Sequence, residues 1–94
     1  MLFTTTVGAL IDFNTGLDLT GNLGLSVKIK NLSDGSVVTR SGTSEDLTNG
    51  VVTYTIAADD FETSGYYQLQ VEASFADGVL LQSDIVKQII YNPL

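Results

Sequence analysis

The stretch YQLQVEASF, residues 67–75, decides the fold class, because apolar and polar side chains alternate along its whole length. A period of two is typical of a β-strand with one face buried and the other in water. Shorter stretches with the same alternation occupy residues 25–30 and 51–56. Further β segments are expected around residues 3–7, 9–13, 37–39 and 79–91, so the pattern predicts about seven strands.

Turn-forming dipeptides separate these stretches: Asp34-Gly35, Asn49-Gly50 and Asp77-Gly78. Asn and Asp tolerate positive φ and Gly has no Cβ to clash, so a two-residue hairpin loop is expected at the first pair. The same loop at the third pair would turn the polar Asp84 toward the core opposite Val71. We therefore expect a longer turn or a bulge near residues 82–84, which sets Ile89 opposite Tyr67.

These patterns together predict an all-β protein, a two-sheet antiparallel immunoglobulin-like sandwich of about seven strands that lacks the disulfide and the buried Trp. One short helical turn is expected near residues 57–63, where the chain would cross between the sheets. No linker, charge block or repeat divides the sequence, so residues 1–94 are expected to form a single domain.

Composition excludes several functions. The chain has four basic and eleven acidic residues, a net charge of −7, and no His, Cys or Trp. Without His or Cys it lacks thiolate and imidazole zinc ligands, a Cys nucleophile and a Ser-His-Asp relay, and we expect neither an enzyme nor a cofactor. The acidic balance argues against nucleic acid and anionic membranes as partners. We also expect no export signal and no membrane span.

The motifs run in the order LDLTG (17–21), LSVKIK (25–30), SDG (33–35), NGVVTYTI (49–56), SGYY (64–67) and FADG (75–78). This progression resembles the small immunoglobulin-like domains of tailed-bacteriophage virion proteins, above all the N-terminal domain family of the baseplate upper protein. The resemblance implies a non-enzymatic adapter that docks onto other virion parts. Because only one domain is expected, we favour a small accessory part such as a capsid decoration, neck or tail adapter.

Asp12, Asn14 and Asp18 have the alternating spacing of a calcium loop. The bidentate Glu expected downstream is missing, so an Asx-type turn without a metal is the favoured interpretation.

Asp59, Asp60 and Glu62 could pair for acid–base catalysis. A sandwich this small has little room for a substrate cleft. Acids are favoured at the start of a solvated helical turn, so we interpret these three as surface residues.

Gly65-Tyr66-Tyr67 opens the longest alternating stretch. Tyr67 shares the parity of Leu69 and should lie in the core, with its hydroxyl bonded near the corner turn as in a tyrosine corner. Tyr66 then faces outward and is a candidate contact residue.

The C-terminal stretch has apolar residues on both strand faces, which one face of a sandwich cannot bury. We expect arms at residues 86–94 and 1–7 to pack against a neighbouring subunit or another protein. The alternative is that Val86 and Ile90 tuck beneath the N-terminal strand. The candidate interface residues are Met1, Leu2, Phe3, Tyr66, Val86, Ile89, Ile90 and Tyr91.

These features favour a non-enzymatic virion protein that binds other virion proteins or copies of itself, as a homo-oligomer or on a symmetric assembly. Its acidic surface suits docking on a basic patch. The alternative is a carbohydrate-binding or adhesion module, for which only outward tyrosines such as Tyr66 could form a sugar platform.

Overall fold

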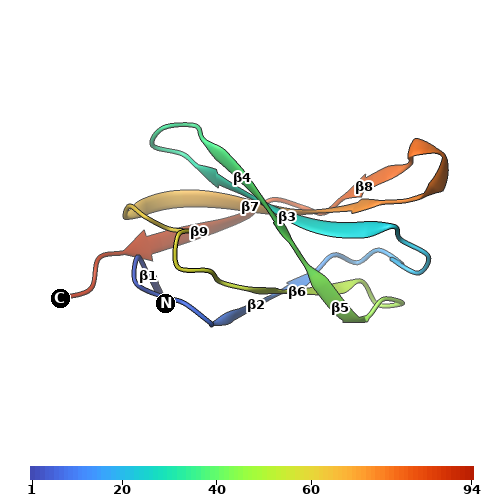
Figure 1. The fold of residues 1–94 in the computed structure, drawn as a ribbon, viewed down its shortest axis with the longest axis horizontal. Helices are drawn as coiled ribbons and strands as arrows, with labels where there is room; N and C mark the ends of the chain where they lie inside the picture. Colours follow the sequence, from blue (N-terminus) through green and yellow to red (C-terminus); the bar gives the residue numbers. More distant parts are fainter.

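The computed structural model describes residues 1–94 and contains nine strands in two sheets. One sheet has six strands: β1 (Leu2–Phe3), β3 (Gly24–Asn31), β4 (Val37–Ser41), β7 (Gly65–Ser74), β8 (Leu80–Gln82) and β9 (Val86–Tyr91). The other has three: β2 (Leu10–Asn14), β5 (Thr43–Asp46) and β6 (Val51–Thr55). The two termini lie at one end of the molecule, and the β7–β8 hairpin lies at the other (Figure 1). None of its helical segments has the length and apolar character that a membrane span requires.

The strand order confirms the predicted immunoglobulin-like sandwich. The larger sheet runs β1-β9-β7-β3-β4, with β8 also pairing with β7, and the smaller runs β2-β6-β5. These orders match strands G-F-C-C′ and B-E-D of an immunoglobulin domain. All pairs are antiparallel except β1 with β9, which is parallel.

The chain changes sheets between β4 and β5, which form one diagonal ribbon in Figure 1. Gly42 occupies the crossing, and a Cβ there would lie 2.9 Å from Cγ1 of Val52 in the opposite sheet. Only glycine lets the backbone pass this close to the second sheet.

The core lies between the two sheets, and most of it consists of the inward side chains that the alternation predicted for β3, β6 and β7. Its largest fully buried side chains come from both sheets and from the segments that join them: Leu19, Val27, Ile29, Val52, Ile56, Phe61, Leu69, Val71 and Ile90.

Two expected turns differ from the prediction. Residues 57–61 form a hydrogen-bonded turn rather than a helix, and the single short 3-10 segment is η1 (Ala76–Gly78). The expected two-residue loop at 34–35 is wrong, because Asn31 and Ser36 close a four-residue loop. The Asn31 side chain accepts the N–H of Ser33 at 2.9 Å, and Gly35 adopts φ 76°, which together stabilise the wider turn.

The expected longer turn and bulge after β7 are both present, but they do not produce the expected change of register. The turn at 76–78 has three residues, and residues 83–85 oppose only two residues of β7, so a bulge separates β8 from β9. The turn and the bulge shift the register by one residue in opposite directions. The expected pairing of Tyr67 with Ile89 is therefore wrong: Gln88 lies opposite Tyr67, and Ile89 lies opposite Tyr66.

Ser83 holds this bulge in place. Its backbone N–H donates to the carbonyl of Val71 at 2.9 Å, and its hydroxyl accepts the N–H of Val71 at 2.9 Å. The side chain of Gln70 donates to the carbonyl of Ser83 at 2.8 Å. The Ser83 hydroxyl thus gives the buried strand a hydrogen-bond partner where the bulge interrupts the backbone ladder.

We predict that Ser83→Ala lowers the free energy of unfolding by about 1–3 kcal/mol, because the N–H of the buried Val71 loses its partner. The matched control is Ser74→Ala, also on β7, whose exposed hydroxyl makes only a 3.5 Å contact with the carbonyl of Gly24 on β3. Urea denaturation measures the free energy of unfolding of both variants. Equal stability of the two would contradict the role assigned to Ser83.

Candidate interaction surface

Four of the eight candidate interface residues lie together on the outer face of the six-stranded sheet, the face that points away from the smaller sheet. Tyr66 faces outward as predicted and is 62% exposed. Ile89 lies opposite it on β9, and Tyr91 follows two residues later on the same face. Phe3 of β1 pairs with Tyr91, and their ring centroids are 6.3 Å apart. We call Phe3, Tyr66, Ile89 and Tyr91 the apolar patch.

The other four candidates lie elsewhere. Ile90 is only 1% exposed, and its neighbour Leu2 on β1 packs against the same core, so both serve the interior of this chain. Val86 lies opposite Leu69 on the inward side, yet it remains 45% exposed because β1 pairs only with the last two residues of β9. Met1 is exposed.

The corner before β7 fixes the direction of Tyr66. The hydroxyl of Tyr67 donates to the carbonyl of Thr63 at 2.7 Å, which confirms the predicted tyrosine corner. The ring of Tyr67 also meets Phe61 edge to face, with centroids 5.0 Å apart. Because Tyr67 is anchored inward, its neighbour on the strand must point outward.

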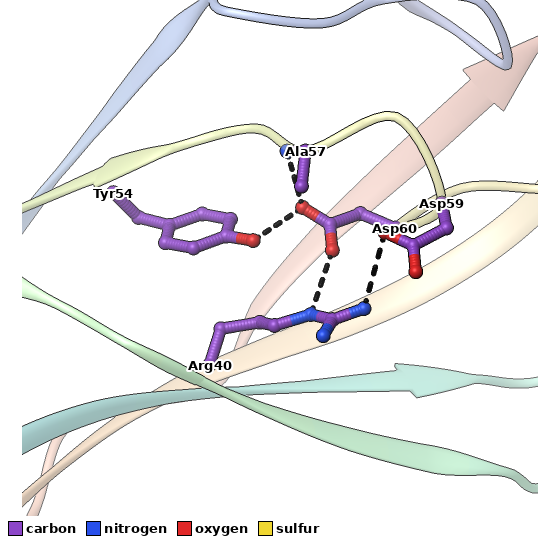
Figure 2. Close-up of polar contacts among 5 residues, drawn as sticks. All are labelled: Arg40, Tyr54, Ala57, Asp59 and Asp60. Carbon is purple, nitrogen blue, oxygen red and sulfur yellow. Dashed lines mark hydrogen bonds and ion pairs between the residues drawn. The ribbon is translucent and has the colours of Figure 1, made fainter.

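The expectation that Asp60 is a surface residue is wrong. Its carboxylate is fully buried and accepts hydrogen bonds from Arg40 Nε at 2.9 Å, the Ala57 N–H at 2.8 Å and the Tyr54 hydroxyl (Figure 2). Arg40 comes from β4 of the larger sheet and Tyr54 from β6 of the smaller one. Asp60 therefore joins the two layers of the sandwich.

Asp59 does lie at the surface, where it pairs with Nη2 of Arg40 at 3.3 Å. Burial raises the pKa of Tyr54, and the hydrogen bond to Asp60 raises it further. The hydrogen bond to Asp60 also raises the pKa of Arg40. Both donors therefore stay protonated at neutral pH and hold the carboxylate in place.

One feature of the sequence does indicate this cluster. Tyr54 lies on the inward parity between Val52 and Ile56, and a buried tyrosine hydroxyl needs a hydrogen-bond partner.

The calcium candidates each bond to a different part of the chain. Asp12 accepts the hydroxyl of Thr53 at 2.7 Å, across the β2–β6 pair. Asn14 and Asp18 accept backbone N–H groups two residues ahead, at 3.3 Å and 3.0 Å. The bonds to Thr20 lower the pKa of Asp18. No group of three or more His, Cys, Asp or Glu side chains is placed to hold a metal ion.

The family model described as the BppU N-terminal domain matches residues 8–91. The match runs from just before β2 to the last residue of β9 and so covers every strand except β1. No curated protein and no solved structure matches the chain.

We predict that Asp60→Ala lowers the free energy of unfolding by about 3 kcal/mol, because it leaves Arg40 and the Tyr54 hydroxyl without their shared acceptor. Asp59→Ala is the matched control and should cost less than about 1 kcal/mol, because its ion pair is exposed. Thermal and urea denaturation compare the two. Similar losses would show that the buried carboxylate does not join the sheets as described.

Proposed function

The chain belongs to the BppU N-terminal domain family, and we propose on that basis that it is a non-enzymatic docking domain of the baseplate. In this proposal the apolar patch on the outer face of the six-stranded sheet contacts a neighbouring virion protein.

Membership of this family places the chain in a phage virion. BppU is the baseplate upper protein of a phage, so this chain is a structural component of the virion. We therefore propose a position in the baseplate rather than the capsid or neck positions considered from the sequence.

The observation that carries the proposal is the exposure of the apolar patch. The inner face of the larger sheet packs on the smaller sheet, whereas Lys30, Tyr66 and Lys87 on its outer face are exposed. Three of the four patch residues are aromatic, and Tyr66, Ile89 and Tyr91 are all at least 40% exposed. Aromatic side chains are enriched at the centres of protein interfaces, where they contribute most of the binding energy.

The surface also favours a binding role over a catalytic one. The carboxylate most isolated from water, Asp60, already has three hydrogen-bond partners within the chain. The hollows on the surface measure about 130–150 Å³, well below the roughly 300–1,000 Å³ of typical ligand sites.

We predict that the double variant Tyr66→Ala/Ile89→Ala, supplied during infection, is incorporated into particles at least tenfold less than the native chain. Removing two anchors of an interface commonly costs more than the ~1.4 kcal/mol that a tenfold loss of affinity requires. Quantitative mass spectrometry of purified particles measures the incorporation.

The matched control is Leu23→Ala. Leu23 is 72% exposed and lies beside the other end of the larger sheet, where its N–H bonds to Ser74. This variant should be incorporated normally. In isolation, both variants should have the same melting temperature as the native chain. Normal incorporation of the double variant would contradict the proposal.

A further inference from the structure

The basic residues are distributed very unevenly over this acidic chain. Lys28 and Lys30 of β3 and Lys87 of β9 all point to the outer face of the six-stranded sheet, whereas Arg40 points inward. Among the six strands of this sheet, only β7 carries a carboxylate on the outer face, that of Glu72. With three lysines against one glutamate, that face is positive in a chain whose net charge is −7.

Two of the three lysines have no ionic partner within the chain. Lys28 Nζ pairs with Glu72 at 2.7 Å, and this bond lowers the pKa of the glutamate. Lys30 and Lys87 form no ion pair and are exposed. The register aligns them on either side of Gln68, so they lie two strand spacings apart, about 10 Å. We call Lys30 and Lys87 the free lysine pair.

Apolar side chains border the free lysine pair on both sides. On one side, Tyr66 and Ile89 of the apolar patch form the next outward-facing cross-strand pair after Gln68 and Lys87. On the other side, a hollow of about 150 Å³ is lined by Lys28, Lys30, Val37, Gln68, Leu69, Gln70 and Ile85. Val37 and Ile85 are both more than half exposed. The outer face thus combines apolar anchors with two unpaired positive charges.

We propose that this face binds an acidic surface of a different virion protein, whose carboxylates pair with Lys30 and Lys87; the inference rests on the docking role proposed above. Such charge complementarity sets the orientation and raises the rate of encounter, while the apolar patch supplies affinity.

A second copy of this chain fits the face less well. A two-fold symmetric pairing through it would set the lysines of one copy against those of the other, and like charges at an interface oppose binding. Any other arrangement would still join two chains that each carry a net charge of −7.

The test is carbodiimide cross-linking of purified particles, because this reagent joins a lysine amine directly to a carboxylate in contact with it. Mass spectrometry should find Lys30 or Lys87 linked to Asp or Glu of another virion protein. The Lys28–Glu72 link within the isolated domain is the positive control for the reagent.

Charge reversal provides the second measurement. Lys30→Glu/Lys87→Glu should reduce incorporation into particles at least tenfold, whereas the matched variant Lys30→Arg/Lys87→Arg should be incorporated normally. Neither lysine contributes to the core, so both variants should fold.

A link to a second copy of this chain, or no link at either lysine while the control link forms, would overturn the inference. Hydroxyl-radical labelling of Tyr66 separates this failure from that of the docking role. Protection of Tyr66 in particles without lysine links would refute only the acidic partner, whereas unchanged labelling of Tyr66 would refute both.

Discussion

One extra residue between β8 and β9 determines which side chains of the last strand reach the surface. Three residues of this connection oppose only two of β7, and the bulge exchanges the two faces of β9. If the β7–β8 register continued, Lys87 and Ile89 would turn into the core and Ile90 would be exposed. Ser83 stabilises the bulge because its hydroxyl accepts the N–H of Val71. The apolar patch and the free lysine pair both depend on this arrangement.

Contacts on the inward side of the same sheet hold the strands of its outer face in place. Asp60 joins β4 to β6 through Arg40 and Tyr54, so the two layers are linked by a buried carboxylate as well as by apolar packing. The tyrosine corner holds the start of β7 through the bond from Tyr67 to Thr63. The outward side chains of the larger sheet therefore stand on strands that are fixed from beneath, which limits the entropy lost when they bind.

The alternation of apolar and polar residues predicted the strands that have one buried face. The three alternating stretches became β3, β6 and β7, and the corner role of Tyr67 followed from its parity. β5 was not predicted, because Thr43–Asp46 is wholly polar and forms an edge strand through its pairing with β6. The register of β9 was mispredicted because the turn and the bulge offset one another. Asp60 was misplaced because its partner Arg40 lies 20 residues away, on a strand whose path the sequence does not reveal.

We propose that the outer face of the six-stranded sheet is the side of this domain that meets the rest of the virion. Electron cryomicroscopy of the particle tests this placement. We expect a neighbouring protein in van der Waals contact with Tyr66 and Ile89, with its carboxylates beside Lys30. A reconstruction in which this face points into solvent, and the domain is held through β2-β6-β5 instead, would contradict it.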